Sequence, residues 1–306
     1  MRFAHVVAVL SDPMLARLTL ESIGLQQRPP DLVVLVADSG HQHAFGPSAL
    51  APRLTPVEHV YLPAASYGSA TPGALYLEGL RTVAGRADVA IFCREGLLFR
   101  SDHLHAIEKA FDASADLVGV LETAGDIVNL DVTGPARTAA AILAAPRRRG
   151  AALDIVRRWL APRLSSGYAL SARTAVVAGL AFHRFSDRPD WIEFSGFIDR
   201  LAPRGRTVTT SAGPIVNLQR VSDRRSGFDA GQQAYRALAA LVDDAAGRPM
   251  PARPETIRLG LHHLTRALLN PAERSWSLSF LKGMWSARVA TRTTRKAVAR
   301  DVRDLV

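Results

Sequence analysis

Charged and polar residues follow three short apolar runs in the first third of the chain. The runs and the residues after them are 5–10 with Ser11 and Asp12, 32–37 with Asp38, and 89–92 with Arg94 and Glu95. Short apolar runs bounded by turn residues are typical of buried strands, and open parallel sheets bind ligands at the carboxyl ends of their strands. Carboxylates placed there would accept hydrogen bonds from a ligand, and an arginine would hold a phosphate group. The same residues also occur as turn formers and helix caps, so a structural role remains an alternative for each.

The elements that must position these residues follow one another as strand, helix and strand. An amphipathic stretch over 14–25 predicts a helix between the first two runs, and Pro29 and Pro30 end it. This order predicts a βαβ unit and a parallel sheet. Further alternation up to residue 121 favours an α/β fold. From residue 136 the pattern is mainly helical, with a last strand within 208–219.

The chain is predicted to divide into a domain of residues 1–226 and a helical extension of residues 227–306. Helices are expected over 232–246, 254–269 and 279–305, and no strand is expected among them. The 306 residues are 48% hydrophobic, which is sufficient for one large core or two smaller ones.

The net charge of +10 favours anionic partners, namely nucleotides, nucleic acid or an anionic membrane surface. Cys93 is the only cysteine, which excludes an intramolecular disulfide and a metal site made of cysteines. Without a signal peptide or a long apolar run, we expect a cytoplasmic protein that is soluble or peripheral to the membrane. The histidine pairs 41/43, 103/105 and 262/263 lack the spacing of a zinc site and are expected at the surface.

Four motifs occur in a consistent order between residues 5 and 226. They are the opening unit that ends in Ala37-Asp38-Ser39-Gly40, the glycines from Gly68 to Gly85, the stretch Ile91-Phe92-Cys93-Arg94-Glu95-Gly96, and Glu193-Phe194 followed by Arg200-Leu201 and Gly205. In this order they resemble the family 2 glycosyltransferases. The resemblance implies a GT-A-type α/β fold with a mixed, mostly parallel sheet flanked by helices. It also implies inverting transfer of a sugar from a nucleotide sugar to a hydroxyl acceptor.

The resemblance assigns the donor site to residues of the first half. The family's turn carboxylate recognises the base of the nucleotide, and Asp38 occupies that place; Ser11 and Asp12 would face the donor. The family's Asp-x-Asp motif holds a divalent ion, Mn²⁺ or Mg²⁺, against the diphosphate, but Arg94 and Glu95 stand in that stretch here. Glu95 alone provides too few ligands for a metal ion, and the alternative is that Glu95 is a solvent-exposed carboxylate of a loop. Arg94 would then contact the diphosphate directly, without a metal.

Other positions also depart from the family's pattern. The family's general base is an aspartate where this chain has Phe194, which leaves Glu193 and Asp190 as the nearest carboxylates. The family's Arg-Asn pair is replaced by Tyr76 and Leu77. Arg220 stands where the family often has a diphosphate-contacting arginine. These departures support a second hypothesis, a non-catalytic relative that binds or scaffolds.

The C-terminal stretch combines basic residues from Lys282 to Arg303 with Trp285 and several valines. A basic amphipathic helix lies on anionic membranes, which would suit a lipid-linked acceptor; a saccharide or another hydroxyl compound is the alternative acceptor. The other interpretation of the stretch is a helix packed on the core with a solvated face. Nucleic-acid binding is not expected, because aromatic residues do not alternate with the basic ones.

Overall fold

The structure is a computed structural model. It describes residues 1–10, 12–38, 57–62, 72–123, 126–129, 138–144, 168–178, 180, 194, 197–198, 200–210, 215–219, 227–229, 231–232, 234–235, 257, 260–261, 263–265, 267–268 and 274–303. The chain divides into two compact units, Met1–Arg148 with Pro162–Val221, and Arg149–Ala161 with Ser222–Val306. The first, larger unit contains the sheets, and the described residues of the second are helical; the functional boundary after residue 226 stays a prediction.

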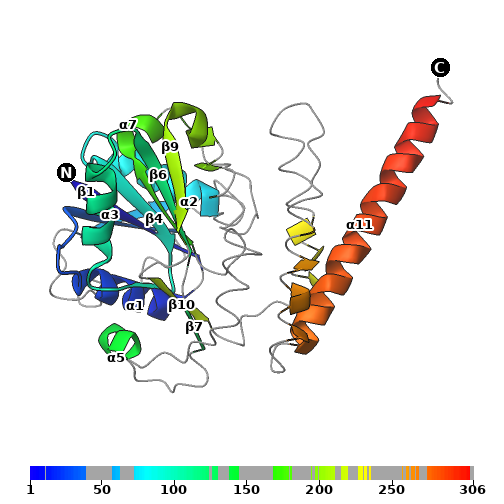
Figure 1. Cartoon of the computed structure of the whole chain (residues 1–306), viewed down its shortest axis with the longest axis horizontal. Helices are drawn as coiled ribbons and strands as arrows, with labels where there is room; N and C mark the ends of the chain where they lie inside the picture. The colour runs from blue at the N-terminus through cyan, green and yellow to red at the C-terminus, as the bar shows by residue number, and fades with distance from the viewer. Residues whose placement is uncertain are drawn as a thin grey trace. The chain divides into compact units, whose positions relative to one another are not determined.

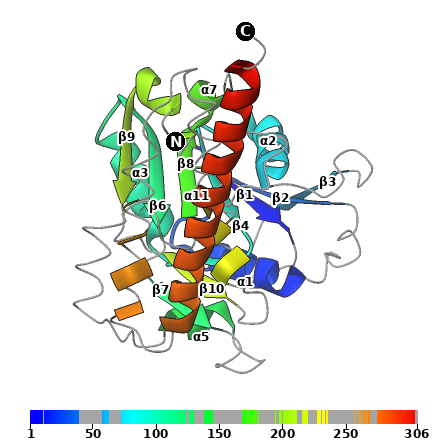
Figure 2. The same ribbon diagram turned by 90° about the vertical axis from the view of Figure 1, so that its right-hand side faces the viewer.

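A seven-stranded sheet forms the centre of the larger unit (Figures 1 and 2). Its order is β3 (Val57–Leu62), β2 (Leu32–Asp38), β1 (Phe3–Val9), β4 (Val89–Arg94), β8 (Tyr168–Arg173), β6 (Leu117–Thr123) and β9 (Arg206–Thr210). All neighbours are parallel except β8, which is antiparallel to both β4 and β6. The predicted mixed, mostly parallel sheet is therefore confirmed.

Helices cover both faces of this sheet. α2 (Pro72–Val83) and the short α7 (Thr174–Val177) pack on one face, and α1 (Pro13–Gly24) and α3 (His103–Asp112) pack on the other. All seven residues of β1 are buried. A strand covered on both faces has no solvent side, which explains why the sequence shows a continuous apolar run instead of an alternating one.

A second, three-stranded sheet lies beside α1. Its order is β5 (Leu97–Phe99), β10 (Ile215–Gln219) and β7 (Asp126–Asn129), and its apolar residues pack with α1 and α5 (Ala139–Ala144). The single strand predicted within 208–219 is therefore two strands in two sheets, β9 and β10. The mainly helical pattern predicted from residue 136 is wrong at β8, whose alanine and serine residues give a weak strand signal.

The helical unit is built on α11 (Arg274–Arg303), which begins five residues before its predicted start. Two glycines let α11 approach the helical residues near 230 closely. A Cβ on Gly231 would lie 2.0 Å from the carbonyl oxygen of Phe280, and a Cβ on Gly283 would lie 2.0 Å from that of Phe228. None of the helices that the structure describes combines the length and the hydropathy that crossing a lipid bilayer requires.

Candidate functional site

The order of the central sheet reverses at β1. The chain runs from β1 outward to β2 and β3, and returns to form β4 on the other side of β1. Val9 of β1 is in register with Ala37 of β2, and Ala8 is in register with Arg94 of β4. The carboxyl ends of the three strands therefore meet at one edge, as predicted from the apolar runs. Ligands bind at such a reversal in open parallel sheets, because the flanking connections diverge there.

Glu95 holds the end of β1 to the end of β4. Its side chain is buried, with only 5% of the residue exposed, and its Oε2 accepts a hydrogen bond from the backbone N–H of Leu10 at 3.1 Å. Its own backbone N–H donates to the carbonyl oxygen of Ala8 at 3.0 Å. The interpretation of Glu95 as an exposed loop carboxylate is therefore wrong, and the carboxylate positions backbone.

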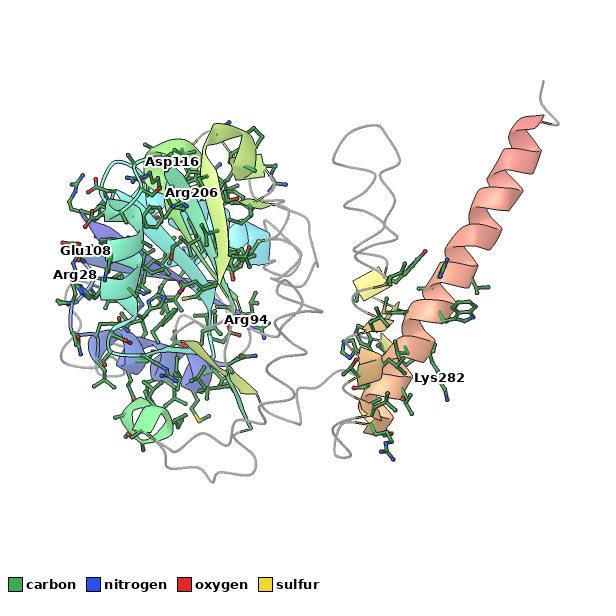
Figure 3. The ribbon with its side chains drawn as sticks, viewed as in Figure 1. Arg28, Arg94, Glu108, Asp116, Arg206 and Lys282 are labelled. Carbon is green, nitrogen blue, oxygen red and sulfur yellow. The ribbon has the colours of Figure 1, made fainter. Side chains whose placement is uncertain are left out.

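The turn after Arg94 is fixed by its neighbours. Gly96 has a φ of 88°, a left-handed conformation that favours glycine. Its N–H donates to Thr19 Oγ1 of α1 at 2.9 Å, and its carbonyl oxygen accepts from the N–H of Leu218 in β10 at 2.7 Å. Arg94 thus stands on a turn held by a helix and two sheets. Figure 3 shows it at the opposite end of the sheet from Asp116 and Arg206.

Asp12 caps the helix that leaves this edge. Its Oδ1 accepts hydrogen bonds from the N–H groups of Met14 at 2.9 Å and Leu15 at 3.3 Å, the geometry of a helix N-cap. Pro13 in the first turn suits a helix start, because it lacks the N–H that would otherwise need a partner. Asp12 therefore has the structural role of a helix N-cap, and its contact with the donor stays a prediction.

The described residues do not fit a divalent ion at this edge. They contain no group of three or more His, Cys, Asp or Glu side chains arranged to hold a metal. In the stretch where the resemblance expects Asp-x-Asp, the chain has a cation in Arg94 and a carboxylate in Glu95 that accepts a hydrogen bond from backbone. Hard cations need several oxygen ligands, so no step of a mechanism is assigned to a metal here.

Several predicted site residues lie outside the described part of the chain. These are Ser11, Asp190, Glu193 and Arg220. The backbone of Asp38 is described as the last residue of β2, beside Leu62 of β3, but its side chain is not. The roles of these residues stay predictions.

Two positions that depart from the family's pattern contact each other. Tyr76, which replaces the arginine of the resemblance, and Phe194, which replaces the general base, are both fully buried. Their ring centroids are 4.9 Å apart, and Tyr76 also meets Phe92 of β4 edge-on at 6.1 Å. Aromatic pairs at this separation stabilise a core. Both positions therefore contribute to packing, and Phe194 is no part of an accessible catalytic site.

The sequence interpretation missed a buried ionisable cluster under α3. His103 Nε2 donates to Glu122 Oε2 at 2.8 Å, and both side chains are almost wholly buried. His5 of β1 lies next to this pair, with its ring centroid 6.3 Å from that of His103. Burial, together with the nearby His103, lowers the pKa of His5 to about 3.

The expectation that the paired histidines lie at the surface is wrong for His103 and for His263, which is also buried. Helical spacing could have placed His103 correctly, because it shares the inner face of α3 with Leu104, Ile107 and Phe111.

The sequence matches no protein-family model and no curated protein. Among solved structures, the chain is similar to mannosyltransferase PcManGT from Pyrobaculum calidifontis in complex with GDP-Man and Mn²⁺. The TM-score is 0.50 at 17% identity, over 97% of this chain and 80% of that one. It is also similar to S. aureus TarS 1–349 in complex with UDP-GlcNAc, with a TM-score of 0.51 at 15% identity, over 94% of this chain and 81% of that one.

At these identities the similarity establishes the fold alone. It agrees with the seven-stranded, mostly parallel sheet and the flanking helices, and it confirms the fold implied by the sequence resemblance. Membership of family 2 stays a prediction. The chain has the GT-A-type α/β fold of the nucleotide-sugar glycosyltransferases.

Proposed function

We propose that this protein transfers a sugar from a nucleotide-sugar donor to a hydroxyl acceptor with inversion. The observation that carries the proposal is the meeting of the ends of β1, β2 and β4 at the strand reversal of a GT-A-type sheet. Leu10, Asp12, the backbone of Asp38 and the turn of Arg94 all belong to this edge. The two similar structures hold GDP-Man and UDP-GlcNAc, which supports a donor of this class.

In this proposal the nucleotide lies across the edge. Asp38 accepts hydrogen bonds from the base, while Ser11 and Asp12 face the donor at the start of α1. Arg94 and Arg220 bind the diphosphate, because a guanidinium forms two parallel hydrogen bonds with phosphate oxygens. The fixed turn of Arg94 supports this role, since a positioned cation loses less conformational freedom on binding.

We infer that the reaction is independent of a metal. A divalent ion in other enzymes of this fold neutralises the diphosphate, and Arg94 brings one positive charge to the corresponding stretch. Glu95 is engaged with the N–H of Leu10 and supports that turn. Removal of the ion by a chelator should therefore leave donor binding unchanged.

Inversion needs one in-line displacement and one base within hydrogen-bond reach of the acceptor hydroxyl. Glu193 or Asp190 is the proposed base, because Phe194, which follows Glu193, cannot accept a proton. The leaving nucleoside diphosphate keeps the electron pair of the broken bond, and the base takes the proton of the attacking hydroxyl.

A thermal-shift series with UDP, GDP and their sugars, each with Mn²⁺ or with EDTA, tests the donor site. A ligand at a hundred times its dissociation constant stabilises the native state by about 2.7 kcal/mol. We expect one nucleotide to raise the melting temperature equally in Mn²⁺ and EDTA, and Arg94→Ala to abolish the rise. Arg81→Ala is the matched control, because Arg81 is exposed on α2 and pairs with Glu78. A rise seen only with Mn²⁺ would exclude the metal-independent site.

A second function, a non-catalytic binding or scaffolding protein, is favoured by the packing of Tyr76 on Phe194. The two hypotheses differ in turnover. Release of nucleoside diphosphate from a bound donor, lost in Glu193→Gln or Asp190→Asn, supports the transferase. Donor binding without release in the presence of saccharide and lipid-linked acceptors supports the second function.

The acceptor in this proposal is a saccharide, a lipid-linked compound or another molecule with a free hydroxyl. We further propose that the protein acts in the cytoplasm and at the inner surface of the membrane.

A further inference from the structure

The inner face of α11 is used by the core of the helical unit. Ser277, Phe280, Met284 and Ala287 follow one another at helical spacing, and all are buried. The ring of His263 stacks on that of Phe280 with centroids 3.8 Å apart, and Gly231 and Gly283 bring the backbones together. This face holds α11 in place and is not open to a partner.

The outer face of α11 consists of Leu278, Lys282, Trp285 and Val289, which also follow one another at helical spacing. Their three apolar members are 42%, 64% and 48% exposed, respectively, and Lys282 is exposed between them. Figure 3 shows Lys282 extending from α11 on the side away from the helical residues that it packs against. A helix face that is only solvated is polar, so the exposed leucine and tryptophan require another explanation.

The charge of α11 indicates the sign of a partner. Between Arg274 and Arg303 the helix has eight basic residues and one acidic residue, a net charge of +7, while the whole chain has +10. The guanidinium of Arg288 lies 5.7 Å from the centre of the Trp285 ring, so one of these cations borders the outer face. A surface that combines cations with exposed apolar groups fits an anionic partner with an apolar interior.

We propose that the outer face of α11 docks on an anionic lipid surface. Leu278 and Val289 would enter the boundary of the acyl chains, Trp285 would lie at the level of the headgroups, and Lys282 and Arg288 would contact lipid phosphates. A second copy of this chain is disfavoured, because two helices of charge +7 repel each other. Nucleic acid is also disfavoured, because it is bound through cations and stacked aromatic rings, and exposed leucine and valine would add little to its affinity.

The helical unit has a second set of exposed apolar side chains. Ile257, Leu261, Leu264 and Leu268 recur at helical spacing and are 43–67% exposed. Their segment packs on α11 through His263, and the Nε of Arg274 donates to the carbonyl oxygen of Ala267 at 3.1 Å. The helical unit thus exposes further apolar side chains besides those of α11.

Flotation of the full chain with lipid vesicles tests the proposal without any sugar donor, so its outcome is separate from that of the transferase reaction. We expect binding to vesicles of phosphatidylglycerol with phosphatidylcholine, and little binding to phosphatidylcholine alone. The double variant Leu278→Ser, Trp285→Ser should weaken binding by at least about tenfold. Lys282→Gln should weaken it about fivefold, and added salt should do the same in the wild-type chain.

Val208→Ser is the matched control, because Val208 is an exposed valine on β9 of the larger unit. It should bind vesicles as the wild type does. Far-UV circular dichroism of each variant shows that the exposed substitutions leave the helices folded. A blue shift of tryptophan emission on anionic vesicles, lost in Trp285→Phe, would locate the contact.

Three results would overturn the proposal. They are a wild-type chain that stays with neither type of vesicle, a double variant that binds as well as the wild type, and a concentration-dependent mass in light scattering that the double variant abolishes. The last result would assign the outer face to a second copy of the chain.

Discussion

The two faces of the central sheet bury different chemistry. Towards α2, the described interior is filled with aliphatic side chains and aromatic rings, including the contact of Tyr76 with Phe194. Towards α1 and α3, it also encloses His5, His103 and Glu122. The resemblance expects polar chemistry at the positions of Tyr76 and Phe194, on the face that is apolar here. The comparison teaches that two positions can match the spacing of a known motif and yet serve the packing of the core, because apolar side chains stand where the motif has reactive ones.

Introducing at position 194 the aspartate that the resemblance expects should have the largest effect. Phe194→Asp removes a buried ring and places a carboxylate beside Tyr76, so we expect a loss of at least about 4 kcal/mol in the free energy of unfolding. Phe194→Leu should lose about 1–2 kcal/mol by the cavity alone. Urea unfolding followed by circular dichroism measures both. An aspartate variant as stable as the leucine variant would show that this position is open to solvent.

Breaking the buried pair on the other face should cost nearly as much. Glu122→Ala leaves the ring of His103 without the carboxylate that binds it at 2.8 Å, and we expect a loss of about 3–5 kcal/mol. The double variant Glu122→Leu, His103→Leu should recover most of that loss, because neither member of the pair then remains without the other. A double variant that loses as much stability as Glu122→Ala would mean that the unpaired histidine is not the cause of the loss.

The pH dependence of stability should differ between His5 variants. Since the pKa of His5 is about 3 in the native state against 6.5 ordinarily, the unfolded chain binds a proton at a higher pH than the native chain. The free energy of unfolding should therefore fall as the pH decreases from about 6.5 towards 3, by about 1.4 kcal/mol per pH unit, and be unaffected by this group above that range.

His5→Phe keeps an aromatic ring against Phe99 and removes the group that titrates. Denaturation at several pH values should show a shallower acid loss for the variant, and identical slopes would contradict the assignment to His5.

Substitutions of two buried serines on the α1 and α3 side of the sheet should have the smallest effects on stability. They compare a hydroxyl that is hydrogen-bonded on both sides with one that is not. Ser22 Oγ donates to the carbonyl oxygen of Thr19 at 2.7 Å and accepts from the N–H of Phe99 at 3.1 Å, so Ser22→Ala should cost about 1–3 kcal/mol. The buried Ser171 Oγ has no hydrogen-bond partner within the described part of the chain, and Ser171→Ala should change stability by less than about 0.5 kcal/mol. Equal effects would show that both hydroxyls are hydrogen-bonded in solution.

The strands that meet where the order of the central sheet reverses could be predicted from the sequence because each is a continuous apolar run. β1, β2 and β4 are covered on both faces, and their order with the helices between them fixes a parallel sheet. β8 was missed because Tyr168–Arg173 contains small residues and no β-branched one, so its strand conformation depends on pairing with β4 and β6.

The orientation of single polar side chains was less predictable. Glu95 turns inward because the N–H of Leu10, 85 positions earlier, needs an acceptor, and no local pattern contains that requirement. His103 pairs with Glu122 on a strand that follows the helix, and neither residue alone signals the pair. Side chains at the site depend on contacts between distant segments, whereas the strands depend on local composition.

The place of β8 in the sheet has a consequence for synthesis on the ribosome. β4 and β6 are both complete by Thr123, but the strand that joins them begins at Tyr168, 45 positions later. At roughly 5–20 residues per second, translation needs about 2 to 9 s to supply it. During that interval the nascent chain presents the unpaired edge of β4, a surface on which other strands can add. Chaperone capture or a translational pause in this window would therefore affect the yield of folded protein more than one after residue 173.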